Sequence, residues 1–327
     1  MSMKKILFYG GPILLAVILC LSLGSSFPSC AVDSLFDKRG APEKKVSKVF
    51  EHLGVSVSSL DQANEFAQKN LLRKGERWDT QEENEWHAII HDKKYLLLND
   101  LKALGMIDSV EPQQKNYTYV LVMGTITGVV AKRLDYLAEL KQNGILFRQI
   151  VLLGSERPLR DNEKYGLPKE ISTEAQMMKH LCDNHCIFEN DNIIVVNAPM
   201  IKHNDGTFIR PNTDDTIAYF AKIAPEDGSC LVISNNPYVL RQTKVTQRIL
   251  DQVRFPTEGA GKKVNQETID IVMLMDEFAR TIYEEYRQAK GNLSKSIVWY
   301  ISSVNKLLPA CYLFNNIFMY IRSIRFS

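Results

Sequence analysis

Short apolar runs and longer amphipathic stretches alternate between residues 116 and 290. Four runs rich in β-branched or aromatic residues have the length of buried strands, namely residues 117–123, 149–153, 193–197 and 230–234. Between them, apolar residues recur at helical spacing, as with Val130, Leu134 and Leu137. Uninterrupted apolar strands joined through helices are typical of a parallel sheet covered on both faces. The pattern therefore predicts an α/β domain over residues 116–290.

Helix-start signals fit this interpretation. Thr173 and Gln176 have the spacing of a capping box, and Asn212 precedes a first turn that carries two aspartates. We also expect Asn236 to be an N-cap and Pro237 to be the first residue of the helix that follows the fourth apolar run.

The segments on either side of the α/β pattern differ from it. Residues 32–115 begin with a polar spacer and then show helical spacing, without a strand signal, from residue 44 to about residue 104. A last amphipathic helix is predicted near residues 267–286. Residues 291–327 are apolar, but Lys306 and Pro309 interrupt them. We expect this tail to be a docked or interfacial helix rather than a second membrane span.

The first 31 residues are typical of an export segment. Lys4 and Lys5 precede a stretch without charged residues that reaches residue 32. A signal peptide and a retained membrane anchor both fit its length and flanks. In either case the chain from residue 33 onward lies outside the cytoplasm, because positive charge stays inside. We expect an inner-membrane protein that faces the periplasm, or a periplasmic protein exported after signal cleavage.

The charge balance argues against a nucleic-acid partner. The chain has 40 Lys and Arg residues against 38 Asp and Glu residues, a net charge of +2. Lys4 and Lys5 supply that excess, so the remainder of the chain is neutral. A neutral domain has no broad basic face to attract nucleic acid.

The predicted sheet selects a set of candidate ligand-binding residues. In open parallel sheets, ligands bind beyond the carboxyl ends of the strands, where loops and helix N-termini converge. Helix N-termini attract anions, so we expect a small anionic ligand. The candidates are Gly124, Thr125, Arg133, Ser155, Glu174, Asn212, Thr213, Ser234, Asn235, Tyr238 and Arg241. We assign no catalytic residue among them.

A structural interpretation of these residues stays open. Ser, Thr and Asn beside helix starts commonly act as caps. Arg241 lies on the apolar face of its helix, so it must pair with a carboxylate or reach an anion in the crevice. Arg133 is placed comparably, and Glu174 opens another helix. A purely structural pair between an arginine and a glutamate is the alternative to ligand binding.

Other motifs carry no site. His87 and His91 share a helical face, but Ala88 stands where a zincin has glutamate, so no metal site is expected. Residues 259–263 resemble a phosphate-binding loop without its spacing, and we expect a flexible connector. The cysteines beyond the N-terminal segment are too few and too scattered for a disulfide scaffold.

Residues 117–250 resemble the YdcF/SanA/ElyC-like family, whose domain has no assigned function. The motifs that carry the resemblance are Val122-Met123-Gly124, Arg133-Leu134, Ser155, Thr173-Glu174-Ala175, Asn212-Thr213 and the segment from Ser234 to Arg241. Two features depart from the family pattern. Ser155-Glu156-Arg157 stands where glycines are usual, and the family's histidine near Tyr238 is absent.

The resemblance implies a Rossmann-like fold and a link to the cell envelope. The full expectation is an α/β protein with a three-layer Rossmann-like parallel sheet, a helical N-terminal lead-in and a C-terminal apolar helical tail. One relative is described as binding S-adenosylmethionine, so that cofactor is implied by resemblance alone.

Three functions therefore compete. The first is an envelope protein that binds, or processes, a phosphate-bearing or glycan-linked small molecule in the crevice. The second is a nucleotide or S-adenosylmethionine binder, which conflicts with export because such cofactors are scarce outside the cytoplasm. The third is a non-catalytic envelope scaffold, which the two departures favour.

Overall fold

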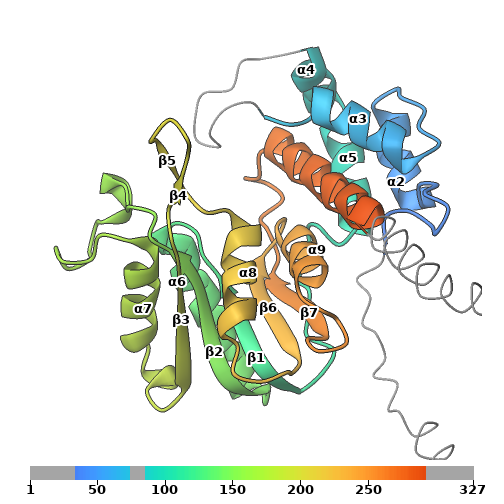
Figure 1. Cartoon of the computed structure of the whole chain (residues 1–327). Coiled ribbons are helices and arrows are strands. Elements are labelled where there is room, and N and C mark those ends of the chain that lie inside the picture. Colours follow the sequence, from blue (N-terminus) through green and yellow to red (C-terminus); the bar gives the residue numbers. More distant parts are fainter. Residues whose placement is uncertain (1–33, 74–84, 292–327) are drawn as a thin grey trace, which may run out of the picture. The chain divides into compact units, whose positions relative to one another are not determined.

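A five-stranded parallel sheet forms the centre of the α/β domain (Figure 1). The computed structural model describes residues 34–73 and 85–291. The strand order is β3-β2-β1-β6-β7. The strands are β1 (Asn116–Met123), β2 (Leu146–Ser155), β3 (Asn192–Ala198), β6 (Cys230–Asn235) and β7 (Thr257–Lys262). From β1 the chain builds first toward β3 and then returns to the other side of β1, so the order reverses between β1 and β6.

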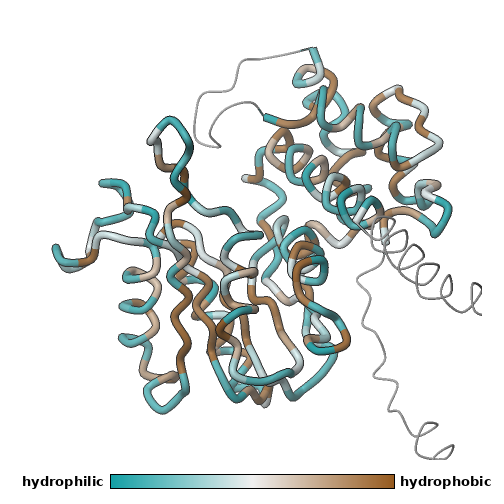
Figure 2. Tube along the Cα trace, viewed as in Figure 1, coloured by the Kyte–Doolittle hydropathy of each residue, from teal (hydrophilic) through white to brown (hydrophobic). Residues whose placement is uncertain are grey.

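Helices cover both faces of the sheet, as the apolar strands require. They are α6 (Thr127–Gln142) and α7 (Glu174–Asp183) on one face, and α8 (Thr213–Ile223) and α9 (Val239–Ile249) on the other. Side chains of β1 alternate between the two cores, with Val120 and Val122 against α6 and α7, and Tyr119 and Leu121 against α8 and α9. Figure 2 shows the strands β1, β2, β3 and β6 as the most hydrophobic segments of this domain. The three-layer Rossmann-like prediction is confirmed.

Two of the predicted helix starts are confirmed, and one is wrong. Thr173 caps α7 in a capping box with Gln176, and Asn212 caps α8. Pro237 does not begin α9, because the helix starts two residues later, at Val239, with Tyr238 as its N-cap. The Asn236 side chain instead donates to the backbone carbonyl of Gly105 at 3.0 Å, in the lead-in.

The predicted flexible connector at residues 259–263 is wrong, because β7 occupies most of it. This edge strand pairs with β6 in parallel register. It has no apolar run because α9 packs too closely for side chains. A Cβ at Gly259 would lie 1.9 Å from Thr243 Oγ1, and one at Gly261 would lie 2.5 Å from a methyl group of Val239. The glycines are spacers between helix and sheet rather than loop residues.

The lead-in is helical, as predicted. Its helices are α2 (Lys44–His52), α3 (Leu60–Asn70), α4 (Glu85–Asp92) and α5 (Lys94–Ala103). They share one apolar core with the helix over residues 271–291, the unlabelled orange-red helix in Figure 1. Leu240 of α9 belongs to the same core, which joins the lead-in to the sheet domain.

Ion pairs join α9 to the helix over residues 271–291. Lys244 binds Glu285 at 2.7 Å, Arg248 binds Glu284 at 2.9 Å, and Arg241 binds Glu277. Both members of each pair lie on surfaces that face the other helix, and all three glutamates are buried. We call these contacts the ion-pair ladder.

Several shorter elements complete the described chain. They are the 3-10 helices η1 (Asp161–Glu163) and η2 (Cys186–Phe188) and the hairpin of β4 (Ile201–Lys202) and β5 (Phe208–Ile209). The predicted signal or anchor at residues 1–31 and the apolar tail beyond residue 291 lie outside the described residues. Within the described ranges, none of the helices has the length and apolar character of a membrane span.

Candidate functional site

A cavity of about 410 Å³ opens where the strand order reverses, at the carboxyl ends of β1 and β6. This is the place at which open α/β sheets bind ligands. Residues that lead into all four sheet-covering helices line it, together with the loop after β2 and the helix over residues 271–291. The cavity is therefore shared by the sheet domain and the helix that completes the core of the lead-in.

Arginine dominates the lining. Six guanidinium groups contribute, from Arg133, Arg157, Arg160, Arg210, Arg241 and Arg280. Among the described residues, Glu174 is the one carboxylate in the lining. Such a surface favours an anion, and the planar guanidinium fork matches the oxygens of a phosphate.

Arg133 lies at the reversal point itself. Its Nη1 donates to the carbonyl of Met123 at 2.6 Å, and its Nε and Nη2 donate to Asn235 Oδ1 at 3.0 and 2.8 Å. Nη2 also donates to Ser234 Oγ at 3.3 Å. Only 2% of the residue is exposed. No carboxylate of the described residues forms an ion pair with Arg133, so neutral oxygens alone meet its buried charge.

The pKa of Arg133 reflects this environment. Burial lowers it from 12.5 to about 10, and the carboxylates of Glu174 and Glu277, which do not contact Arg133, oppose the shift only in part. Burial acts in the same direction on Arg241, but the Glu277 carboxylate beside it outweighs burial and raises the pKa of Arg241. Both side chains remain cationic at neutral pH, and only Arg133 lacks a compensating negative charge in contact.

The helix over residues 271–291 fixes two further arginines of the lining. Glu277 binds Arg241 from the opposite helix, and Asp276 binds Arg280 one turn along at 3.0 Å. Both carboxylates are buried. They hold the two guanidinium groups at the cavity wall without lining the cavity themselves.

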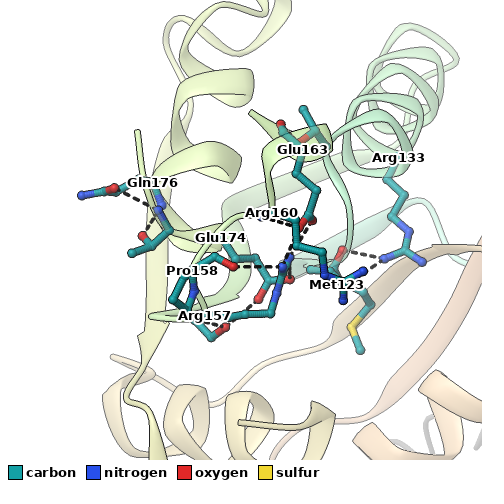
Figure 3. A network of polar contacts seen from close by, with 12 residues as sticks. Met123, Arg133, Arg157, Pro158, Arg160, Glu163, Glu174 and Gln176 are labelled. Carbon is teal, nitrogen blue, oxygen red and sulfur yellow. Dashed lines mark hydrogen bonds and ion pairs between the residues drawn. The ribbon is translucent and has the colours of Figure 1, made fainter. Parts of the chain in front are cut away.

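A second polar network holds the loop after β2 (Figure 3). Arg157 forms a two-pronged pair with Glu163, with contacts of 2.8 and 2.9 Å, and reaches Glu174 at 3.4 Å. Ser155 Oγ donates to the other oxygen of Glu174 at 2.6 Å. Burial raises the pKa of Glu163, but its contacts with Arg157 and the Arg160 backbone outweigh burial, and the net shift is downward.

The helix N-termini at the cavity are of two kinds. Asn212 Oδ1 accepts from the amides of Asp214 and Asp215, so this side chain acts as a cap for α8. The first residues of α6 and α9 receive no side-chain cap from the described residues. Their amide groups add partial positive charge to the same cavity.

The structure brings most of the predicted site residues together. Those that line the cavity are Gly124, Thr125, Arg133, Glu174, Asn212, Thr213, Tyr238 and Arg241. Three others lie behind it, where Ser155 holds Glu174 and where Ser234 and Asn235 hold Arg133. These three position charged side chains and do not line the cavity.

Sequence reasoning left several lining residues out of the site. The rule for parallel sheets also places Arg157 and Arg210 at this edge, in the loops after β2 and β3, and both line the cavity although the list of candidates did not contain them. Arg160 lies further along the same loop as Arg157. No sequence pattern placed Arg280 at the cavity. The spacing of apolar residues in its helix predicted an apolar face, but it did not show which part of the protein the polar face contacts.

No family model matches the chain, and no curated protein or solved structure matches it either. A search of the described residues for three or more neighbouring His, Cys, Asp or Glu side chains placed to hold a metal ion finds none. Cys182, Cys186 and Cys230 are free thiols.

Proposed function

We propose that this protein binds a small phosphate-bearing anion in the arginine-lined cavity. The observation that carries the proposal is Arg133, a buried guanidinium that lines the cavity and is met by neutral oxygens only. Leaving a buried charge without a counter-charge costs free energy, and a bound anion recovers it. The uncapped starts of α6 and α9 add to the same attraction.

The charges of the cavity favour this function over S-adenosylmethionine binding and over a scaffold, whereas a nucleotide carries phosphate itself and conflicts only with export. S-adenosylmethionine carries a sulfonium cation, which six guanidinium groups in one lining would repel. A scaffold has no need to keep an unpaired guanidinium buried at a cavity wall. The YdcF-like resemblance forms part of the proposal, because it concerns the same strand ends and the same Arg133 and Arg241.

We place this binding in the cell envelope, on the outer side of the inner membrane. Support comes from Lys4 and Lys5 followed by an uncharged stretch that reaches residue 32. A reporter enzyme fused after residue 291, active only outside the cytoplasm, tests the location. An active fusion supports this location. If that fusion is inactive, and a second reporter that works only in the cytoplasm is active at the same position, the location is contradicted.

The binding test uses Arg133→Met in the full chain, titrated calorimetrically with inorganic phosphate and with pyrophosphate. Met fills the space without charge and leaves no carboxylate unpaired, and a circular dichroism spectrum like that of wild type checks that the fold is retained. We expect at least a tenfold loss of affinity, because the anion loses the attraction of a buried positive charge that no carboxylate contacts.

Arg254→Met is the matched control. Arg254 is an exposed arginine that pairs with Asp227 at 2.6 Å, near the amino ends of β6 and β7. Its removal leaves phosphate affinity unchanged. A wild-type protein that binds neither anion, or an Arg133 variant that binds as tightly as wild type, contradicts the proposed function.

A further inference from the structure

Glu174 is out of place in a cavity built for an anion. A carboxylate in the lining repels a phosphate group, and each such contact weakens binding. Glu174 nevertheless lines the cavity among the six arginines, and it is about nine-tenths buried. Its presence therefore needs a reason other than attraction of the anion.

Neutralising Arg157 is not that reason. Glu163 already meets both terminal nitrogens of Arg157, at 2.8 and 2.9 Å, whereas Glu174 reaches only one of them at 3.4 Å. Glu163 is 3% exposed and does not line the cavity. Arg157 would keep its charge partner if Glu174 were a neutral residue.

Several residues instead hold the Glu174 carboxylate in one place. Ser155 Oγ donates to Oε2 at 2.6 Å, and Arg157 approaches Oε1 (Figure 3). The backbone amide of Glu174 donates to the carbonyl of Arg157 at 3.0 Å, which ties the start of α7 to the loop after β2. The carboxylate thus has few orientations available to it.

The backbone around Glu174 is also shaped to admit it. A Cβ at Gly124 would lie 3.1 Å from Glu174 Oε1 and 2.5 Å from the carbonyl oxygen of Leu153. A Cβ at Gly154 would lie 2.8 Å from the Cα of Ala175, the residue after Glu174. Glycine at both positions lets α7 bring Glu174 to the end of the sheet.

From these contacts we infer that Glu174 accepts a hydrogen bond from a hydroxyl group of the ligand, so that the ligand is a phosphorylated sugar or polyol. The inference rests on the proposed function, because the arginines bind the phosphate. A fixed carboxylate oxygen is a strong acceptor for a hydroxyl group, and it disfavours ligands that offer only negative charge. Glu174 is thereby the specificity-determining residue of the cavity.

The test compares glycerol 3-phosphate with propyl phosphate, which has a similar carbon chain and no hydroxyl group. Both are titrated against the full chain and against Glu174→Gln. We expect wild type to bind glycerol 3-phosphate at least tenfold more tightly. In the variant, affinity for glycerol 3-phosphate falls, and affinity for propyl phosphate rises because a repulsive charge is gone.

Glu156→Gln serves as the matched control. Glu156 is exposed, follows Ser155 directly and does not line the cavity, so this variant keeps the wild-type preference. Opposite changes for the two ligands distinguish recognition from a structural role, since a damaged site loses affinity for both.

Three results overturn the inference, and they differ in what else they affect. Equal binding of both esters by wild type, or a parallel loss of both in Glu174→Gln, overturns the hydroxyl contact while phosphate binding stands. If the wild-type protein binds neither inorganic phosphate nor either ester, the proposed function is overturned together with this inference.

Discussion

Arg133 carries a positive charge into a site where 98% of its surface is covered and only neutral oxygens meet it. Asn235 and Ser234 orient the guanidinium group without compensating its charge. The desolvation cost therefore remains in the free protein, and it lowers the pKa of Arg133. A bound anion would raise this pKa, because ligand and proton then favour each other's binding.

Sulfate keeps the same charge as the pH rises from neutral to alkaline. We therefore expect its affinity for the protein to follow the protonation of Arg133. Affinity stays level near neutral pH and falls as the pH approaches about 10, where Arg133 loses its proton. Calorimetric titration of sulfate at a series of pH values measures this. Arg133→Met binds sulfate more weakly at neutral pH. Its affinity falls less steeply toward high pH than that of wild type, because residue 133 then has no proton to lose. An identical decline in that variant contradicts the assignment.

At this scale the sequence predicted which residues gather but not how they act. Strand ends and helix starts were enough to select Gly124 and Glu174, and a position on its helix comparable to that of Arg241 selected Arg133. The spacing of Arg241 showed that it needed a partner, but it did not show that Glu277 is that partner. Ion pairs between distant segments depend on tertiary packing, which local spacing does not determine.

At the scale of elements, β7 shows how a strand can lack an apolar signal. Its sequence, Thr257–Lys262, contains two glycines that lie against α9. The four predicted strands bury large side chains on both faces, and that is why their periodicity was informative. An edge strand whose neighbour helix touches its backbone has no such requirement. In β7, the short distance between α9 and the sheet determines which residues are possible.

Gly259→Ala tests this account. The new methyl group would meet Thr243 Oγ1, which is buried and donates to the Val239 carbonyl at 2.8 Å. We expect the free energy of unfolding to fall by about 1–3 kcal/mol, as for other overpacked sites. Urea unfolding followed by circular dichroism measures the change.

Gly128→Ala is the opposing control for Gly259→Ala. Gly128 lies in α6, and a Cβ there meets no atom within 4 Å among those of the described chain. Alanine therefore stabilises the helix by up to about 1 kcal/mol. If both alanine variants unfold at the same urea concentration, the close approach of α9 to β7 is not what selects glycine.

For the whole molecule, the helix over residues 271–291 connects the parts of the described chain. Its apolar side completes the core of the lead-in, and its acidic side forms the ion-pair ladder with α9. Glu285 also accepts from the amide of Leu35 at 2.9 Å, at the start of the lead-in. The sequence predicted this helix and its apolar face. It did not predict that the polar face would be buried as well.

Variants of Lys244 and Glu285 test how much the ion-pair ladder contributes to stability. Glu285→Leu leaves the buried ammonium group of Lys244 without its partner, and we expect a loss of about 3–5 kcal/mol in the free energy of unfolding. Lys244→Met combined with Glu285→Leu removes both charges and recovers the part of that loss that comes from the unpaired ammonium group, while the amide of Leu35 stays without its acceptor. Denaturant unfolding of the three proteins provides the comparison. A double variant no more stable than the single one contradicts a role for the unpaired charge.

The position of this helix after the sheet in the sequence has a consequence for biosynthesis. The lead-in is made before the segment from residue 271 that completes its core. When synthesis reaches that segment, all five strands of the sheet have been made, while Arg280 and the carboxylate that binds Arg241 have not. A nascent chain thus exposes the apolar sides of α2 and α5 until the helix over residues 271–291 is made, and it depends on protection from aggregation until then.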